Sequence, residues 1–318
     1  MYVLTMSNET FGQSRYSYKV FGMSVRSEFP IPELPKITRR KADVSIEIGK
    51  TPNSLKASEK SDNLWAVGEG EFLFHPPGIA RFYAVDGNRI LVDPEISVHN
   101  ADLRSFMLGS CMGALLQQRR KLTLHAGSFV MNGKAYAVCG KSGAGKSTTC
   151  ALFQNQGAQM LSDDVSVINL DDIDGKASIE PGYPQRRLTQ KSVTMFGLRA
   201  SDYAISHSDK GKYVCPIQSN QFCNKATPIG AIFVLNFNPN ESPSTCRQLQ
   251  QTEALAHIRR HIYRRKLLLT KTQKDFFMKI GRIISTVPVF LITRPMHIDS
   301  FHEIETLIKK QINNNIMH

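Results

Sequence analysis

Three features of the sequence predict an α/β fold in two parts. Residues 140–148 form a glycine-rich stretch between a short apolar run and a helical pattern. Residues 16–92 carry short segments of strand-type alternation separated by turn signals, and residues 100–119 change to helical periodicity. We therefore predict a β-rich N-terminal module over residues 1–115, continued by a linking helix, and an α/β phosphate-loop domain over residues 120–318.

The glycine-rich stretch, GKSGAGKST, fits the pattern G-x-x-x-x-G-K-[ST] at every required position. A strand-type run at residues 135–139 precedes it, and a helical segment that ends at Gly157 follows it. That order brings backbone N–H groups and the positive end of a helix dipole around a polyphosphate. A chance glycine-rich turn is the alternative, and the agreement of strand, loop and helix argues against it.

The pattern assigns individual roles in nucleotide binding. Lys146 is expected to reach the β- and γ-phosphates, Ser147 to offer its hydroxyl to Mg²⁺, and Thr148 to add a polar contact near the phosphates. The glycines let the backbone approach the anion closely. The predicted nucleotide-binding residues are Gly140, Ser142, Gly143, Ala144, Gly145, Lys146, Ser147 and Thr148.

Bulk composition predicts a soluble globular protein, with 41% hydrophobic and 21% charged residues. The six cysteines form no C-x-x-C pair and no metal-ligand spacing with histidine, so we expect reduced thiols in a cytoplasmic protein. The N-terminal residues lack a basic start and an apolar run, and no segment approaches a membrane span. We therefore expect neither a signal peptide nor a membrane partner.

The net charge of +13 would attract phosphate substrates, an acidic protein or peptide, or nucleic acid. The basic residues are spread along the chain, and no helix-turn-helix, zinc-finger or RNP pattern is present. Nucleic acid is therefore the least favoured of the three.

The N-terminal module is predicted to be a β-meander. Its lone tryptophan, Trp65, is expected in the core and not on a ligand platform. The helical segment that follows carries Gly109 and Gly113, which we expect to permit close packing. The expected strands cover residues 16–22, 43–49, 64–67, 71–74, 79–85 and 89–92.

A histidine and two acids flank the phosphate-loop segment. His125 lies in the strand-type run 122–130, where it is either a packed structural residue or a catalytic one. Asp163 and Asp164 interrupt the apolar run 158–168. Two carboxylates beside a buried strand are costly unless a cation or a proton lies near them, which Mg²⁺ and a substrate hydroxyl would supply. A solvent-facing turn is the alternative.

Together these motifs resemble the catalytic domain of the HPr serine kinase/phosphorylase family, whose phosphate-loop fold is akin to that of phosphoenolpyruvate carboxykinase. The resemblance is carried by residues 124–127, 140–148 and 161–165. Residues 180–184 and 287–295 look like segments of diverged HPr-kinase-like proteins found beside lasso-peptide and other peptide-modification genes. Those relatives phosphorylate a serine of a precursor peptide.

The resemblance implies roles for single residues. Asp163 matches the general base that takes the proton of the acceptor serine, and His125 matches the histidine that assists it. Ser147 matches the Mg²⁺-binding hydroxyl, and Asp164 lies beside metal and base. Glu180 would be a second acidic Mg²⁺ ligand, at a spacing that differs from the parent family's. The N-terminal module does not resemble the parent enzyme's, which argues against HPr as the acceptor.

An arginine at the γ-phosphate is expected from the chemistry of phosphoryl transfer. The candidates are the pairs at 186–187, 259–260 and 264–265, and Arg260 is the nominal choice. The last two pairs lie on a predicted basic helix over residues 255–267, whose charges are otherwise simply solvated. The polar stretch 199–226 is predicted to be a mobile lid or substrate loop, or an inert insertion.

The sequence thus predicts an ATP- and Mg²⁺-dependent kinase that phosphorylates a serine hydroxyl of a small protein or precursor peptide, with lasso-peptide tailoring as the implied setting. A small-molecule kinase and an ATP-binding regulatory protein without transfer are the alternatives. Enzymes of the parent family assemble as hexamers, so the resemblance leaves a homo-oligomer open.

Overall fold

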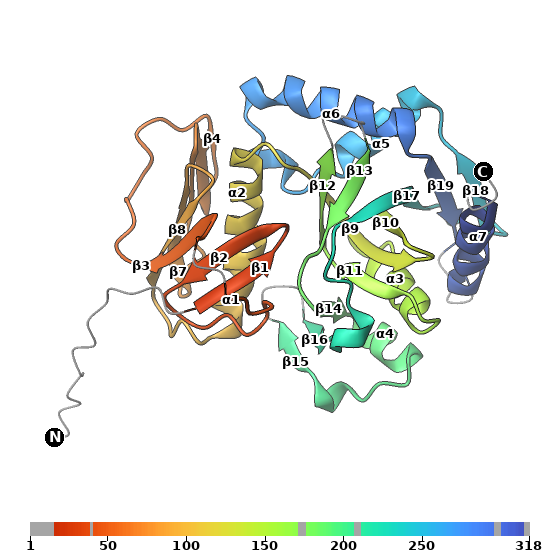
Figure 1. The fold of residues 1–318 in the computed structure, drawn as a ribbon, viewed down its shortest axis with the longest axis horizontal. Coiled ribbons are helices and arrows are strands. Elements are labelled where there is room, and N and C mark those ends of the chain that lie inside the picture. The colour runs from red at the N-terminus through yellow and green to blue at the C-terminus, as the bar shows by residue number, and fades with distance from the viewer. Residues whose placement is uncertain (1–15, 39–40, 171–175, 207–210, 296–299, 315–318) are drawn as a thin grey trace.

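The computed structural model describes residues 16–38, 41–170, 176–206, 211–295 and 300–314. In this part of the chain the fold is mixed α/β, with two eight-stranded sheets and one three-stranded sheet. The N-terminal sheet lies to one side of a central helix and the second large sheet lies to the other (Figure 1). No helix in the described ranges is long and apolar enough to cross a membrane.

The N-terminal sheet has the strand order β1-β2-β3-β8-β7-β6-β5-β4. The expected meander is confirmed for the segment from β4 to β8, whose neighbours pair antiparallel, whereas β2–β3 and β3–β8 pair parallel. Trp65 is half-buried and packs against the core of this sheet. The strands are β1 (Tyr16–Val20), β2 (Met23–Ser27), β3 (Val44–Ile48), β4 (Lys60–Ser61), β5 (Trp65–Gly68), β6 (Glu71–Phe74), β7 (Ala80–Val85) and β8 (Arg89–Pro94).

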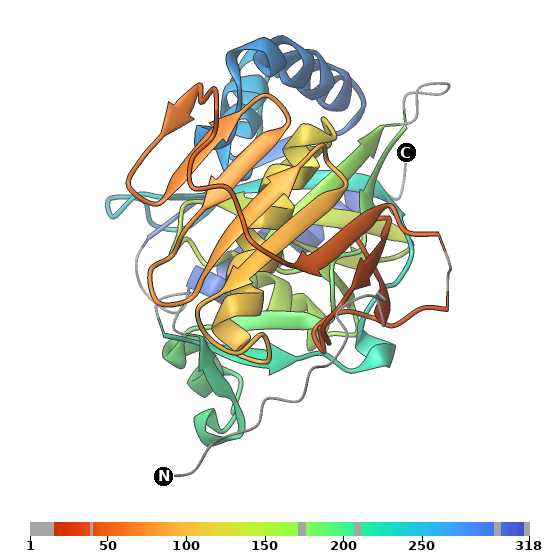
Figure 2. The same cartoon turned by 90° about the vertical axis from the view of Figure 1, so that its left-hand side faces the viewer.

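A single helical rod follows the N-terminal sheet and packs across it (Figure 2). It consists of α1 (Ala101–Phe106), a π-helical turn η1 (Met107–Cys111) and α2 (Met112–Gln118). Asn100 begins the rod by accepting the backbone N–H of Asp102, as an N-cap residue does. The π-helical turn has no signal in the sequence pattern, and such turns are frequent at functional sites.

The second large sheet has the order β10-β9-β12-β13-β17-β19-β18, and β10 also pairs with β17. β10, β17 and β19 run parallel, so the segments that follow these three strands leave the same edge of the sheet. The strands are β9 (Leu122–Met131), β10 (Lys134–Gly140), β11 (Gln159–Ser162), β12 (Val165–Leu170), β13 (Ala177–Glu180), β17 (Thr227–Phe237), β18 (Thr245–Gln248) and β19 (Val289–Arg294).

Helices cover both faces of this sheet. Helices α3 (Lys146–Gln154) and α7 (Ser300–Asn314) pack on one face, and α5 (Gln251–Arg260) and α6 (Gln273–Thr286) pack on the other. The apolar residues of α7 that enter the core recur every four positions, at 304, 308 and 312, which is the spacing of a one-faced helix. α7 therefore packs against the sheet by one apolar face.

The predicted basic helix over residues 255–267 is wrong in its second half, because α5 ends at Arg260. The next residues pair with the edge of β9: His261 O accepts the N–H of His125 at 2.8 Å, and the N–H of Tyr263 donates to Thr123 O at 2.8 Å. Arg264 then turns left-handed with a φ of 52°. Tertiary pairing thus overrides the helical pattern and brings Tyr263 against the rod, where a Cβ on Gly113 would lie 2.7 Å from its ring.

A small third sheet contains β14 (Gln185–Leu188), β15 (Ala204–Ser206) and β16 (Lys212–Pro216), and α4 (Gln190–Met195) packs on it. Of these elements, β15 and β16 belong to the stretch 199–226 that was predicted as a lid or insertion. Leu188, Val193 and Cys215 form the core of this sheet against Ala151 of α3. At β16 the stretch is therefore packed toward the helix that follows the glycine-rich loop, and residues 207–210 within it lie outside the described residues.

Candidate active site

The glycine-rich loop, residues 140–147, joins the end of β10 to the start of α3. Gly145 is the N-cap of α3 with a φ of 101°, a left-handed conformation that favours glycine. A Cβ at this position would also lie 2.7 Å from the ring of Phe301. Gly143 has a φ of 84° and a Cβ there would meet nothing within 4 Å, so its outer side faces open space.

Lys146 opens α3 and is only 8% exposed. Its Nζ donates to the carbonyl oxygens of Gly140 at 3.0 Å and Lys141 at 3.4 Å, so the ammonium lies across the loop. Burial lowers its pKa from the ordinary value, and the negative charge of Asp164 opposes this shift. The site therefore holds a cation that a bound anion would stabilise.

Arg294 at the end of β19 supports the loop from beneath. Its Nε and Nη2 donate to the carbonyl oxygen of Ala144 at 3.3 and 3.1 Å, and its guanidinium stacks on Phe301 at 4.6 Å. It is 6% exposed, and burial lowers its pKa. Sequence reasoning missed this positioning residue, although the parallel strand that ends in Arg-Pro points to the same sheet edge as the loop.

The acid pair lies in the turn between β11 and β12. β12 pairs antiparallel with β9, with Val165 opposite His125, so the two acids preceding Val165 pass beside the next residues of β9. A Cβ on Gly127 would lie 2.9 Å from the backbone oxygen of Asp163. The missing side chain at Gly127 thus lets the acid-bearing turn approach the strand.

Asp163 has a raised pKa, because burial and the neighbouring charge of Asp164 favour its protonated form. The backbone N–H of Arg187 donates to its Oδ2 at 2.8 Å, and this hydrogen bond and one from the Ser147 side chain oppose the rise. The carboxyl group is therefore held in place by both flanking segments. A carboxylate with a raised pKa is suited to act as a general base.

Asp164 behaves in the opposite way. Burial alone would raise its pKa, but the contact with His125 and the charge of Lys146 outweigh it, and the net pKa lies below the ordinary value. Nδ1 of His125 lies 3.1 Å from Oδ1 of Asp164, an ion-pair distance. The environment thus raises the pKa of Asp163 and lowers that of Asp164. Such a difference suits one carboxyl group to stay ionised and the other to accept a proton.

Two predicted site residues do not join this group. The Thr148 hydroxyl is buried 2.8 Å from the Ser192 hydroxyl of α4. Glu180 lies against Gly22 of the β1–β2 turn, where a Cβ on Gly22 would be 2.8 Å from its carboxyl carbon. Glu180 is paired with Val167, and Val167 belongs to the core of the N-terminal sheet, which explains why this carboxylate faces that sheet.

The described residues contain no group of three or more His, Cys, Asp or Glu side chains that could hold a metal ion by themselves. This does not exclude the residues from Mg²⁺ binding, because Mg²⁺ usually takes one or two carboxylates together with phosphate oxygens and water. The residues that fit such a site are Ser147, Asp163 and Asp164, since the Ser147 side chain lies close enough to the Asp163 carboxyl group to oppose the rise of its pKa.

The N-terminal module forms one wall of the site. A small cavity of about 20 Å³ is lined by Asp163 and Asp164, by Phe21 of the β1–β2 turn, and by Leu108 and Gly109 of the π-helical turn. The backbone N–H of Phe21 donates to Pro181 O at 2.8 Å, which fixes the turn beside the acid pair. A cavity of this size holds about one water-sized group.

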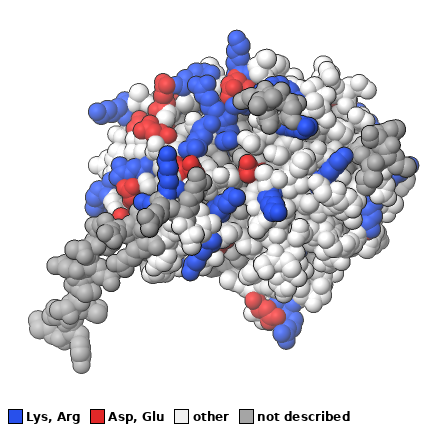
Figure 3. Space-filling view, viewed as in Figure 1, with Lys and Arg blue, Asp and Glu red and all other residues white. Residues whose placement is uncertain are grey.

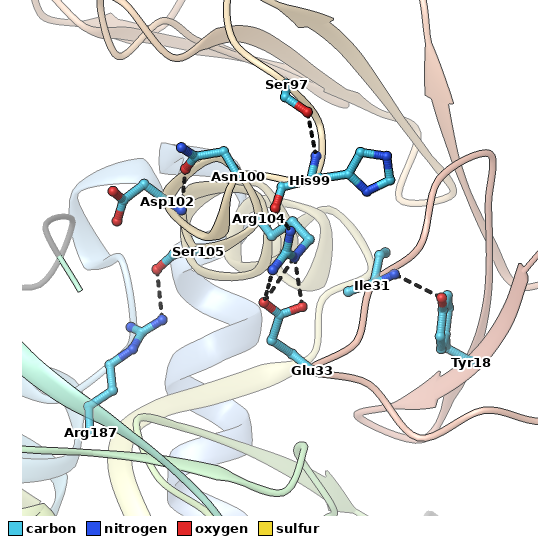
Figure 4. Close-up of polar contacts among 10 residues, drawn as sticks. All are labelled: Tyr18, Ile31, Glu33, Ser97, His99, Asn100, Asp102, Arg104, Ser105 and Arg187. Atoms are coloured by element: carbon cyan, nitrogen blue, oxygen red, sulfur yellow. Dashed lines mark hydrogen bonds and ion pairs between the residues drawn. The ribbon is translucent and has the colours of Figure 1, made fainter. Parts of the chain in front are cut away.

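Arg187 links the acid pair to α1, and Figure 4 shows its contact with Ser105 of that helix. Its backbone bonds to Asp163, and its Nη2 donates to the Ser105 hydroxyl at 2.7 Å. The buried ion pair between Arg104 and Glu33, with Nε 2.9 Å from both carboxylate oxygens, fixes the same turn of α1. The position of the N-terminal module is thus coupled to the carboxylate of Asp163.

Arg260 lies at the end of α5 and lines a cavity of about 540 Å³ together with His125 and the first residues of the glycine-rich loop. Of the other arginine candidates, Arg186 bonds Gln154, and Arg264 donates to the Ser110 hydroxyl at 2.7 Å. Arg259 lines a different cavity. The structure thus brings Arg260 beside the loop, and its contact with a γ-phosphate stays a prediction.

No family model matches the sequence, and no curated protein matches it. Among solved structures, the HPr(Ser) kinase/phosphatase from Coxiella burnetii matches with 14% identity and a TM-score of 0.32, over 61% of this chain and 96% of that chain. A TM-score this low assigns neither fold nor activity. The function of the present chain therefore has to be inferred from the residues of its own site.

Proposed function

We propose that the protein transfers the γ-phosphate of ATP, with Mg²⁺, to a serine hydroxyl of a small protein or precursor peptide. The observation that carries the proposal is the meeting of a glycine-rich loop and an acid pair: Ser147 and Lys146 of the loop both lie close enough to Asp163 to interact with its carboxyl group. Lys146, the buried cation of the loop, lies close enough to both acids to affect their charge. Phosphoryl transfer needs mainly this combination of positioning and charge neutralisation.

The residues have distinct tasks in this mechanism. The loop amides and Lys146 bind the phosphates, while Arg294 holds the loop through Ala144. Asp163 accepts the proton of the acceptor hydroxyl as the acceptor oxygen bonds to the γ-phosphorus. The bond from that phosphorus to the bridging oxygen breaks, and ADP leaves with the bond's electron pair. Mg²⁺, when bound at Ser147 and Asp164, would neutralise charge on the phosphates.

The contact between His125 and Asp164 keeps Asp164 ionised next to Asp163. This negative neighbour raises the pKa of Asp163 and so increases its affinity for the proton of the hydroxyl. The cavity of about 20 Å³ beside these acids suits a single hydroxyl group of the acceptor. A precursor peptide of the lasso type is the acceptor that the sequence resemblance suggests.

The test is incubation of the protein with MgATP and with peptides encoded by neighbouring genes, followed by mass spectrometry. We expect one added phosphate on a serine, and Asp163→Asn should slow its formation by about 10²–10⁴-fold. ATP consumption should require the acceptor. Full activity of Asp163→Asn would show that Asp163 is not the general base. Phosphorylation of a small molecule alone would indicate a small-molecule kinase. ATP binding without consumption would indicate a regulatory protein.

A further inference from the structure

A cavity beside the glycine-rich loop has a lining with one sign of charge. It measures about 540 Å³ and lies between the start of the loop, the end of β17 and the end of α5. Its ionisable lining residues are Lys141, Arg260, Arg264, His125, His257 and His261, and its other lining residues include no Asp or Glu. Protein surfaces ordinarily mix the two signs of charge, so this lining favours an anionic occupant.

Two of the cationic side chains that line the cavity make no polar contact with other described residues. Arg260 and Lys141 are exposed, and within the described residues their side chains make no hydrogen bond or ion pair. Arg264 differs, because it donates to Ser110 and lies 5.5 Å from the ring centre of Tyr263. Arg260 and Lys141 therefore remain available to a ligand.

The electrostatic surroundings of His261 agree with this geometry. Burial lowers its pKa to about 4, and the charges that lower it further are those of Lys146, His125, His257 and Arg260. Two of these groups, Lys146 of the loop and Arg260 of α5, are a lysine and an arginine, so positive charge reaches His261 from both elements. By contrast, Lys and Arg lie interspersed with Asp and Glu over the N-terminal part of the face drawn in Figure 3.

The position of the cavity relates it to the acceptor hydroxyl. Tyr263 lines both this cavity and the small one at the acid pair. His125 of the large cavity contacts Asp164 of the small one at 3.1 Å. The two cavities therefore adjoin, and the residues next to a hydroxyl placed at Asp163 would enter the basic cavity.

We propose that the basic cavity between the glycine-rich loop and α5 binds an acidic segment of the phosphate acceptor, so that the preferred acceptor carries carboxylates beside its reactive hydroxyl. This proposal rests on the proposed function for the acceptor's identity. Arg260 and Lys141 would bind the carboxylates by charge-assisted hydrogen bonds. The loop amides and Lys146 would bind the nucleotide, which leaves the cavity to the acceptor.

The experiment uses two synthetic peptides that differ only in charge: one carries a serine between glutamates, and the other carries the same serine between glutamines. Binding to the full chain is measured by calorimetry without ATP. We expect the glutamate peptide to bind at least tenfold more tightly. NMR of labelled histidine should show that this peptide raises the pKa of His261, because a bound anion stabilises imidazolium.

Arg260→Gln should weaken the glutamate peptide about tenfold and leave the glutamine peptide unchanged. Arg259→Gln is the matched control, because Arg259 is the preceding exposed arginine but lines a different cavity. In transfer assays Arg260→Gln should raise the KM of the glutamate peptide and leave the KM of the glutamine peptide near that of wild type. An arginine that contacted the γ-phosphate would instead lower kcat with either peptide.

Three results would overturn the inference. Equal affinity for the two peptides would show that the cavity does not select an acidic segment. An equal effect of Arg259→Gln would show that general surface charge, and not the cavity, attracts the peptide. Weaker MgATP binding by Arg260→Gln, with unchanged peptide binding, would make the nucleotide the occupant. Failure of the kinase proposal looks different, because charge-selective peptide binding would then persist without any transfer of phosphate.

Discussion

The adjacent acids Asp163 and Asp164 should affect stability with opposite signs when each is changed to asparagine. Asp163 has a raised pKa in the fold, so its ionised form is disfavoured there. Asp164 has a lowered pKa, so its ionised form is favoured. At neutral pH we expect Asp163→Asn to stabilise the protein and Asp164→Asn to destabilise it.

The magnitudes follow from the contacts. Asparagine at position 163 keeps an oxygen for the N–H of Arg187 and loses the repulsion from Asp164, which should give about 1 kcal/mol. Asparagine at position 164 loses the charge that faces His125 at 3.1 Å, and because the His125 and Asp164 side chains are 33% and 41% exposed, the cost should be about 0.5–1 kcal/mol. The two variants should therefore differ by roughly 2–3 °C in melting temperature for a chain of 318 residues.

The assay is thermal unfolding of wild type and both variants between pH 3 and pH 8, with circular dichroism as the readout. The advantage of Asp163→Asn should grow as the pH rises above the ordinary value of 3.8 through the raised folded pKa, because wild-type Asp163 must then ionise. The deficit of Asp164→Asn should begin to shrink as the pH falls below 3.8, because the unfolded wild type then binds a proton at Asp164 that the folded protein, with its lowered pKa, does not yet bind. Equal shifts of the same sign in both variants would refute the assigned difference in acidity.

Three further substitutions test the loop and its surroundings. Lys146→Met should weaken MgATP binding at least tenfold in calorimetry, because it removes the buried cation of the loop. Gly127→Ala should lower the melting temperature by roughly 4 °C, because its Cβ would lie 2.8 Å from Cys150 Sγ and 2.9 Å from Asp163 O. Arg294→Lys should weaken MgATP about tenfold with little change in melting temperature, because lysine keeps the charge but cannot combine the bonds to Ala144 with stacking on Phe301.

Each of these substitutions has an outcome that would count against it. If Lys146→Met binds MgATP as tightly as wild type does, the loop does not bind the nucleotide through Lys146. Gly281→Ala in α6 is the control for Gly127→Ala, since its Cβ would meet nothing within 4 Å and should stabilise the helix slightly. If both alanine variants behave alike, the close approach at Gly127 is not required. Unaltered nucleotide affinity in Arg294→Lys would reduce Arg294 to a packing residue.

The strand, glycine-rich loop and helix around residues 135–154 could be predicted from sequence because their signals are local. A glycine at a left-handed cap, an apolar strand and a helical segment each leave a pattern within a few neighbours. The meeting of His125 with the acid pair was predictable only through its resemblance to a family. The register of β9 with β12 that produces it depends on residues about forty positions apart along the chain.

Other parts of the site depend on contacts that no local pattern encodes. The helix predicted through residue 267 stops at Arg260 because the following backbone pairs with β9. Glu180 was expected at the metal, but its register with Val167 turns it toward the N-terminal sheet. Thr148 was expected at the phosphates, but it meets Ser192, which belongs to a helix that comes later in the chain.

The wall formed by the N-terminal module was the least predictable feature. Phe21 and the π-helical turn reach the acid pair from segments more than fifty residues before it. Sequence periodicity describes each segment by itself, whereas the contact requires both sheets to be assembled.

The most direct test of phosphoryl transfer at this site is a single-turnover measurement with γ-labelled ATP and an acceptor peptide, on wild type and on Asp163→Asn. The wild type should transfer label to a serine of the peptide, and Asp163→Asn should bind MgATP with similar affinity while transferring label at least 10²-fold more slowly. Transfer at the wild-type rate by Asp163→Asn, or a wild type that fails to bind MgATP, would contradict the account.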